Sequence, residues 1–268
     1  CQSSDYEDIV RVCHKAGIDH YYHIDLSADY YDLVFTKFLD DLNHGLTPNP
    51  DILCNKHIKF DIFYNFLKLF DCDYLATGHY AKIVDGKLSR PSDLSKDQSY
   101  FLHAVNPAVW SKVIFPLGNL PKKTVREIAT RLDLPVATKK DSTGICFIGN
   151  GNYQNFIKDY IKSSPGLIKL PDGKVLGTHG GLFNFTVGQM RNLGLDYHIK
   201  VMVIGKDTKD NTLWVAPFSD TSLTKSDTFK VRDFTSAVSG KCWVRFSNLG
   251  ILHPATVDGD VIFLSNPI

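Results

Sequence analysis

The segment Phe60–Tyr80, FDIFYNFLKLFDCDYLATGHY, joins two patterns that together predict an α/β fold. Its first part places apolar residues at helical spacing, at Phe60, Phe63, Tyr64, Leu67 and Phe70. Asp73–Thr77 has the pattern of a short buried strand, which runs into Gly78 and His79. Because ligands of open parallel sheets lie at the carboxyl ends of strands, we expect these two residues beside a site. A structural role for His79 is the alternative.

The alternation of helices and strands extends to both sides of this segment. Helices are predicted at 5–16, 30–42, 121–133 and 153–161, and a further strand at 21–26. Helices that alternate with short apolar strands favour an open parallel α/β sheet.

From Gly166 onward the helical spacing fades and short alternating runs take over. These runs lie at 167–170, 183–187, 201–204, 212–216, 229–231, 242–246 and 261–264. They predict small β-barrels or β-rich domains, with a linker at 163–166. We therefore divide the chain into an α/β domain at 1–162, a central β-rich domain at 163–228 and a C-terminal β-barrel domain at 229–268 that we expect to be incomplete.

The composition excludes several classes of protein. The 268 residues are 43% hydrophobic and 22% charged, which is typical of a globular protein, and the net charge of +1 creates no global field for nucleic acid. No apolar run is long enough to span a membrane, and the first twenty residues lack the apolar core of a signal peptide. The six cysteines include no C-x-x-C pair and no zinc spacing, so we predict neither a disulfide scaffold nor a metal site.

Thr47–Lys56, TPNPDILCNK, places a thiol just after a rigid turn. Its two prolines prevent a helix from beginning before Asp51, which lies three positions ahead of Cys54. A thiol near a helix N-terminus has a lowered pKa, whereas a carboxylate opposes that effect. Asp51 is therefore expected to cap the helix, bind a substrate group or move a proton. The alternative is a proline-rich turn with a capping aspartate and a small buried cysteine.

A second cysteine motif lies at 139–149, KKDSTGICFIG. Gly144 and Gly149 flank Cys146 and permit close backbone approach, while Lys139 and Lys140 supply positive charge that favours a thiolate. A buried strand bounded by glycines is the alternative.

Several stretches together resemble the tRNA-specific 2-thiouridylase family, which makes 2-thiouridine at the wobble position of tRNA. They are TPNPDILCNKHIKF at 47–60, ATGHYA at 76–81, KDQSYFL at 96–102, FPLG at 115–118, KDSTGICFIG at 140–149 and HGG…FTVGQMRNLG within 177–194. The two cysteine motifs are long and specific, and the matching pieces run in order along nearly the whole chain.

The resemblance implies that 1–162 is an adenine-nucleotide-hydrolase-like catalytic domain that is incomplete at its N-terminus, and that 163–228 is a tRNA-binding domain. It also implies a role for each motif in a tRNA-uridine 2-sulfurtransferase. Cys54 would be the nucleophile-side cysteine, and Cys146 would carry a persulfide sulfur from a donor protein. Asn49, Pro50 and Asp51 would contact the target base, and Gly78 would approach ATP. The tRNA would be contacted by His79, Lys96, Asp97, Gln98, Arg245 and Phe246.

The chemistry of such a site requires ATP with Mg²⁺ to adenylate O2 of the uridine, because oxide is a poor leaving group. A persulfide on Cys146 would deliver sulfur to C2, and Cys54 would close a disulfide with Cys146 that a reductant reopens. The family also begins with a Ser-Gly-Gly-x-Asp-Ser loop for pyrophosphate, which this chain lacks. We expect the sequence to be a fragment rather than a protein that has lost adenylation.

The partners expected are tRNA, through its anticodon-loop wobble uridine, and a sulfur-carrier or cysteine-desulfurase system, with no membrane. The expected compartment is the cytoplasm, or the mitochondrion if the source is eukaryotic. Three other functions stay open: a non-catalytic tRNA-binding remnant of this family, another adenylating α/β ligase, and a thiol-disulfide redox protein, which the absence of C-x-x-C disfavours.

Overall fold

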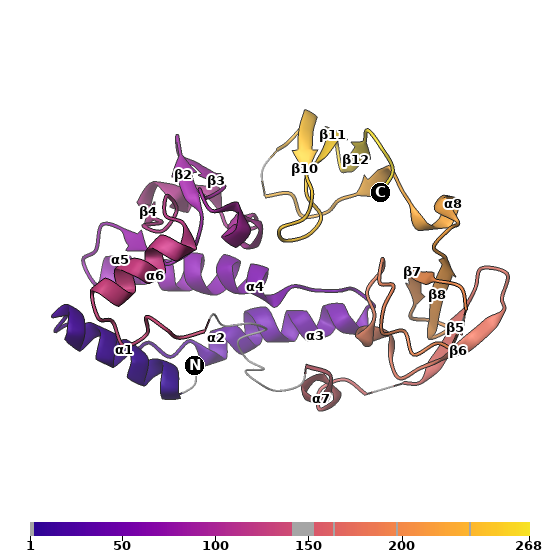
Figure 1. The fold of residues 1–268 in the computed structure, drawn as a ribbon, viewed down its shortest axis with the longest axis horizontal. Coiled ribbons are helices and arrows are strands. Elements are labelled where there is room, and N and C mark those ends of the chain that lie inside the picture. The colour runs from indigo at the N-terminus through magenta and orange to yellow at the C-terminus, as the bar shows by residue number, and fades with distance from the viewer. Residues whose placement is uncertain (1–2, 141–152, 163, 197, 236) are drawn as a thin grey trace. The chain divides into compact units, whose positions relative to one another are not determined.

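The computed structural model describes residues 3–140, 153–162, 164–196, 198–235 and 237–268 (Figure 1). The chain forms two compact units. The first comprises Cys1–Val34, Asp51–Asn150 and Phe246–Ile251. The second comprises Phe35–Pro50, Gly151–Arg245 and Leu252–Ile268.

The helices of the first unit confirm most of the predicted ones. They are α1 (Ser3–Ala16), α2 (Ser27–Tyr30), α4 (Pro50–Leu53), α5 (Phe63–Leu69) and α6 (Lys122–Arg131), with π-helical segments at Tyr31–Phe35 and Cys54–Ile62. Two end residues of these segments, Phe35 and Pro50, belong to the second unit. Short 3-10 helices cover Leu94–Lys96, Ser99–Leu102 and Pro107–Lys112. The strand predicted at 21–26 is wrong: these residues have no regular structure, and Tyr22 is 70% exposed. An apolar run without a neighbouring strand to accept its hydrogen bonds does not form a ladder.

Two pairs of strands belong to the first unit. β1 (Leu75–Ala76) and β4 (Val113–Ile114) pair in parallel, in agreement with the predicted parallel sheet. β2 (Lys82–Val84) and β3 (Lys87–Ser89) form an antiparallel hairpin. Asp85 and Gly86 between them have φ values of +50° and +72°, the geometry of the two-residue turns that fit the twist of a hairpin.

The core of the first unit surrounds the parallel pair. It is built from Phe60, Leu75, Ala81, Leu102, Val105, Val109, Trp110 and Val113. The predicted aromatic stripe therefore serves packing, because Phe60 lies against Trp110 with ring centroids 5.5 Å apart.

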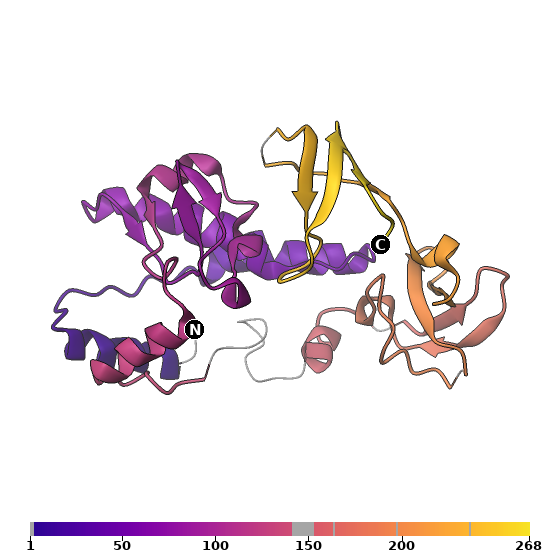
Figure 2. The same cartoon turned by 45° about the horizontal axis from the view of Figure 1, so that its top comes forward.

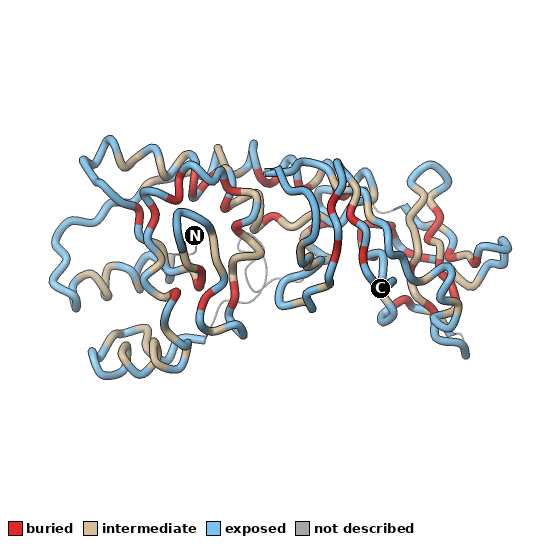
Figure 3. The backbone as a smooth tube through the Cα atoms, turned by 90° about the horizontal axis from the view of Figure 1, so that it is seen from above, coloured by how far each residue is buried: buried red, intermediate tan, exposed pale blue. Residues whose placement is uncertain are grey.

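The second unit contains two four-stranded sheets (Figure 2). One has the order β6 (Val175–His179), β5 (Gly166–Lys169), β8 (Thr212–Pro217), β7 (Val201–Asp207). The other has the order β10 (Gly240–Val244), β11 (His253–Asp258), β12 (Val261–Leu264), β9 (Thr228–Lys230). Only β5 and β8 pair in parallel among these strands of the described chain. Buried and exposed residues alternate along β11 and β12, which gives that sheet one apolar face (Figure 3).

One predicted strand of this unit is wrong. Residues 183–187 do not pair, and Leu182–Asn184 form a 3-10 helix instead. The reason is a local turn: the Gln189 side-chain oxygen accepts a hydrogen bond from the Thr186 amide at 3.0 Å. The apolar side chains Leu182, Phe183 and Phe185 are still buried. The hydrophobic pattern therefore predicted the burial of these side chains correctly but not their secondary structure.

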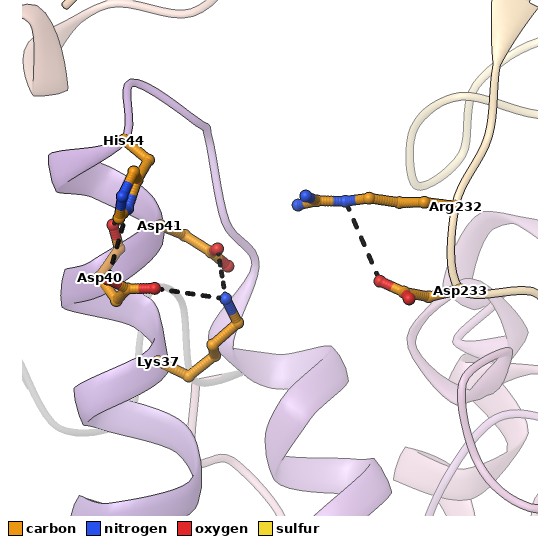
Figure 4. Close-up of polar contacts among 6 residues, drawn as sticks. All are labelled: Lys37, Asp40, Asp41, His44, Arg232 and Asp233. Atoms are coloured by element: carbon orange, nitrogen blue, oxygen red, sulfur yellow. Dashed lines mark hydrogen bonds and ion pairs between the residues drawn. The ribbon is translucent and has the colours of Figure 1, made fainter.

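Helices α3 (Thr36–Asn43), α7 (Tyr153–Lys158) and α8 (Thr221–Thr224) complete the second unit. α3 buries Phe38 and Leu42. On its outer face Lys37 Nζ lies 2.8 Å from Asp41 and 3.5 Å from Asp40, and these carboxylates raise the pKa of Lys37 (Figure 4). The figure also shows Arg232 beside Asp233. Such solvated pairs add little stability.

Candidate active site and tRNA interface

The turn ahead of Cys54 is held within the second unit. Gly45 has φ +74°, and a Cβ added there would lie 2.8 Å from the Thr208 methyl group. Lys206 Nζ donates to the Phe185 carbonyl at 2.8 Å and lies 3.4 Å from the Leu46 carbonyl oxygen. Burial lowers the pKa of Lys206. The backbone that leads to the proline turn is therefore restrained by a close glycine contact and by β7.

The helix that carries Cys54 begins at Pro50, one residue ahead of the earliest start predicted, so Asp51 is its second residue rather than its cap. Pro50 is buried and Asn49 is half-buried. Proline suits the first helical position because the amide lost there has no partner in the helix. Cys54 is the first residue of the π-helical segment Cys54–Ile62 and is half-buried. π-Helical turns within α-helices occur often at functional sites.

Asp51 is half-buried one residue into this helix. Burial raises the pKa of its carboxyl group, and the charge of Lys59 partly opposes the rise. A raised pKa makes a carboxylate a better proton acceptor near neutral pH. The first two turns of one helical stretch therefore carry both a carboxyl group of raised pKa and a thiol.

Asp97 is almost fully buried, with 1% of its surface exposed. Its carboxylate accepts hydrogen bonds from Arg90 Nε at 2.7 Å, the Ser99 amide at 2.9 Å and Ser99 Oγ at 2.6 Å. These contacts satisfy a charge that would otherwise be costly to bury. The carboxylate thus fixes the backbone after residue 97, and the predicted direct contact with tRNA is not tested by this geometry.

Gln98 joins the same segment to the chain that follows β1. The Gln98 side-chain oxygen accepts a hydrogen bond from the Tyr80 backbone amide at 2.9 Å. The Gln98 backbone amide donates to the Tyr80 carbonyl at 3.0 Å. This reciprocal pair places Gly78–Tyr80 beside Lys96–Gln98, two motifs that are 18 residues apart at the bonded positions.

A pocket of about 480 Å³ lies where these motifs meet. It is lined by Gly78, Tyr80, Ser95, Lys96, Asp97, Gln98, Phe101, Lys122, Asn248 and Leu249. Four residues singled out from the sequence, Gly78, Lys96, Asp97 and Gln98, are therefore brought together. The pocket combines the positive charge of Lys96 and Lys122 with the aromatic surface of Tyr80 and Phe101, which suits a phosphorylated, ring-containing ligand.

His79 packs between aromatic rings. Its ring centroid is 5.6 Å from that of Phe60 and 6.1 Å from that of Phe115, and Nδ1 lies 2.9 Å from Thr77 Oγ1. Burial, with a smaller effect of the Lys59 charge, lowers the pKa of His79 to about 4. The imidazole is therefore neutral at physiological pH, and any contact it makes with RNA is a hydrogen bond rather than an ion pair.

The depressed pKa of His79 predicts a pH-dependent stability. The unfolded chain takes up a proton at His79 near pH 6.5 whereas the folded chain does so near pH 4, so this stabilisation is complete above pH 6.5 and is lost as pH falls. Between pH 7.5 and pH 5 the wild type should lose about 2 kcal/mol more than His79→Phe. Urea unfolding followed by Trp110 fluorescence, with Trp214 and Trp243 replaced by Phe, measures this. Equal losses in both proteins would contradict the assignment.

Arg245 and Phe246 follow β10, and Phe246 is 40% exposed. Within the first unit, Tyr100 Oη donates to the Phe246 carbonyl at 3.2 Å. Phe246 thus lies near the segment that carries Lys96–Gln98.

Cys146 lies outside the described residues, so the expected approach of Cys146 to Cys54 is not observed. Lys139, expected to favour a thiolate there, lies 2.7 Å from Asp5 and 2.6 Å from Asp8. Its charge is shared with two carboxylates, which raise the pKa of Lys139. Among the described residues, no three His, Cys, Asp or Glu side chains gather as a metal site requires.

Two further lysines lie near these groups. Lys59 is exposed on the Cys54–Ile62 segment, and its charge acts on both Asp51 and His79. Lys122 lines the pocket, with Nζ 5.5 Å from the centroid of the Tyr80 ring. Its backbone amide donates to Asp93 at 2.9 Å. Lys59 lies within the matched stretch 47–60, whereas Lys122 lies outside the matched stretches and reaches the pocket through folding.

Comparison with known proteins decides the family. A family model described as "tRNA methyl transferase HUP domain" matches residues 1–150, and one described as "tRNA methyl transferase PRC-barrel domain" matches residues 154–217. A tRNA-specific 2-thiouridylase MnmA of Geobacillus thermodenitrificans is 41% identical over 278 aligned residues, which cover 97% of this chain and 75% of the relative. The chain belongs to the tRNA-specific 2-thiouridylase family.

Other members of the 2-thiouridylase family are similar over a shorter part of their length. MnmA 1 of Geobacillus kaustophilus is 48% identical over 80% of this chain and 60% of the relative. The MnmA of Halalkalibacterium halodurans is 47% identical over 80% of this chain and 58% of the relative. The chain thus spans between 58% and 75% of these 2-thiouridylases. The HUP and PRC-barrel descriptions confirm the predicted α/β domain followed by a β-barrel.

Proposed function

We propose that this chain carries the sulfur-transfer site of a tRNA 2-thiouridine synthase, with Cys54 and Cys146 as the reacting cysteines. The observation that carries the proposal is the start of the helix at Pro50. It places a half-buried carboxyl group of raised pKa, Asp51, ahead of the Cys54 thiol in one helical stretch.

The base would be bound by the residues at this helix start. A wobble uridine in a single-stranded loop is turned out of its stack and read along its edge. Asn49 and Pro50 contact the base, and Asp51 accepts the N3–H proton of uracil. The raised pKa of Asp51 suits a group that must gain and release a proton during one turnover.

The tRNA around that base would be held by Lys96 and Gln98 in the pocket, by neutral His79, and by Arg245 and Phe246. Asp97 does not itself touch the tRNA in this proposal. Its buried carboxylate holds Ser99 and Arg90 in place through hydrogen bonds. The predicted contact of Asp97 with tRNA is therefore replaced, in this proposal, by a positioning role.

The residues near Gly78 fit an ATP that approaches the backbone. Gly78 is exposed two residues after β1, and a Cβ added there would meet only Leu117 Cδ1, at 4.0 Å. ATP, when bound with Mg²⁺, supplies the adenylyl group that turns O2 of the uridine into a leaving group.

The sulfur step balances without a further oxidant. The terminal sulfur of a Cys146 persulfide forms a bond to C2 of the uracil, and the activated oxygen departs. Cys54 thiolate then attacks Sγ of Cys146 and breaks the sulfur–sulfur bond, which leaves 2-thiouridine and a Cys54–Cys146 disulfide. A sulfur-carrier or cysteine-desulfurase system supplies the persulfide, and a cytoplasmic reductant reopens the disulfide.

Nucleoside mass spectrometry tests the proposal. The protein is incubated with ATP, Mg²⁺, unmodified tRNA and a persulfide donor, and 2-thiouridine at the wobble position is the expected product. Pyrophosphate exchange into ATP is measured in parallel. Binding of tRNA without either reaction would instead support a non-catalytic member of the family.

Replacing Lys96 by alanine should weaken tRNA binding and leave folding unchanged. A lysine that contacts one phosphate releases about one counterion, so the slope of log Kd against log salt should fall by about one. Filter binding across a series of salt concentrations measures the slope. Lys123→Ala is the matched control, because Lys123 is 89% exposed on α6 and does not line the pocket. Equal slopes for all three proteins would remove Lys96 from the interface.

A further inference from the structure

Asn55, the residue after Cys54, is buried with 2% of its surface exposed. Its side-chain Nδ2 donates to the Asp51 carbonyl at 2.9 Å and to the Phe101 carbonyl at 3.3 Å. The first bond closes the helical turn that contains Cys54. The second reaches a position 46 residues away, in the 3-10 helix Ser99–Leu102.

The other end of the Asn55 amide is not satisfied. Its Oδ1 is buried and has no hydrogen-bond partner in the part of the chain that the structure describes. A buried acceptor without a partner costs free energy, whereas an apolar side chain of similar volume at the same place carries no such cost. The two bonds of Nδ2 and the unpaired Oδ1 act on the stability of the fold in opposite directions, so stability alone gives little reason for an asparagine here.

The bond to Phe101 connects two groups of functional residues. Phe101 lines the pocket, and its amide donates to the Gln98 carbonyl at 3.0 Å. Gln98 is in turn bonded to Tyr80 in both directions. Asn55 is thus the link between the helix of Cys54 and the hydrogen-bonded segment that carries Lys96 and Gln98.

We infer that Asn55 is a positioning residue that sets the place of the Cys54 thiol relative to the pocket lined by Lys96 and Gln98. It acts through backbone carbonyl groups and touches no reacting atom. The inference rests on the proposed function, since it concerns the same tRNA site. A thiol displaced by about 1 Å from its productive position can lose about 100-fold in rate.

Asn55→Leu tests this role in the 268-residue chain, with Asn184→Leu as a matched control. Asn184 also combines a bonded Nδ2, 3.3 Å from the Gly181 carbonyl, with a buried Oδ1 that lacks a partner among the described residues. For Asn55→Leu we expect an unfolding midpoint close to that of the wild type, an unchanged Kd for tRNA, and a fall in single-turnover thiolation of about 10- to 100-fold. For Asn184→Leu thiolation should not change.

A second readout does not depend on thiolation. Alkylation of Cys54 by iodoacetamide, followed by peptide mass spectrometry, should accelerate about threefold or more in Asn55→Leu, because the half-buried thiol loses its fixed place. It should be unchanged in Asn184→Leu. Should the wild type fail to thiolate tRNA while this acceleration is seen, the positioning role holds and the proposed function fails. The inference would be overturned if Asn55→Leu were alkylated at Cys54 and thiolated tRNA at the same rates as the wild type.

Discussion

Cys54→Ser is expected to abolish thiolation of tRNA, with a loss of at least about 10³-fold in single-turnover rate. A serine hydroxyl is not ionised near neutral pH and cannot form a disulfide with Cys146. The step that releases the transferred sulfur from Cys146 therefore stops. Serine keeps the size of cysteine and a polar hydrogen at this position, and Cys54 does not line the pocket, so tRNA binding should persist. Quantification of 2-thiouridine by mass spectrometry, with Kd from filter binding, measures both quantities.

Cys72→Ser provides the matched control for this experiment. Cys72 belongs to the same unit, is exposed, and its thiol lies 3.4 Å from the Phe70 carbonyl. It follows α5 and has no role in the proposed chemistry. Full activity in Cys72→Ser together with loss in Cys54→Ser assigns the effect to the one thiol. Near-normal turnover by Cys54→Ser would refute the mechanism.

Asp97→Ala should destabilise the first unit by about 3 kcal/mol, because it leaves the Arg90 guanidinium without its carboxylate and the half-buried Ser99 amide without its acceptor. The wild-type contacts are 2.7 Å to Arg90 and 2.9 Å to the Ser99 amide. Binding of tRNA should fall only as far as the folded fraction falls. Urea unfolding monitored by Trp110 fluorescence gives the free energy of unfolding. The Kd for tRNA, measured at urea concentrations well below the unfolding transition, tests whether the folded variant still binds.

Two comparisons sharpen the Asp97 experiment. Asp97→Asn keeps the shape and one acceptor oxygen, so its loss should be smaller than that of Asp97→Ala. Asp61→Ala removes an exposed carboxylate of the same unit and should be nearly neutral. If Asp97→Ala folds as well as the wild type and yet loses tRNA binding, the carboxylate contacts tRNA directly, and the positioning role is wrong.

Patterns with a local physical cause were predictable from the sequence. The helix starting at Pro50 follows from proline chemistry, and α6 follows from its spacing after Pro121. The β2–β3 hairpin was not predicted, although the Asp85-Gly86 pair carries the signal for its turn. Residues 183–187 show the opposite error, a strand that was predicted but does not form. Phe183 and Phe185 are buried without pairing to a neighbouring strand.

The long-range part of the site was not predictable in this way. Nothing local distinguishes Asp97 from an exposed charged residue at a helix start; its burial results from Arg90, seven positions earlier, and from the packing around it. The depressed pKa of His79 results from Phe60 and Phe115, which come from other elements. Lys122 reaches the pocket only because α6 begins beside Asp93.

The most direct test of the central claim, that Cys54 and Cys146 exchange sulfur over one uridine, is a single turnover without reductant. Protein loaded with one persulfide is mixed with ATP, Mg²⁺ and tRNA, and its peptides are mapped under non-reducing conditions. The account predicts one Cys54–Cys146 disulfide for each 2-thiouridine formed. Formation of 2-thiouridine with both cysteines still outside a disulfide would contradict it.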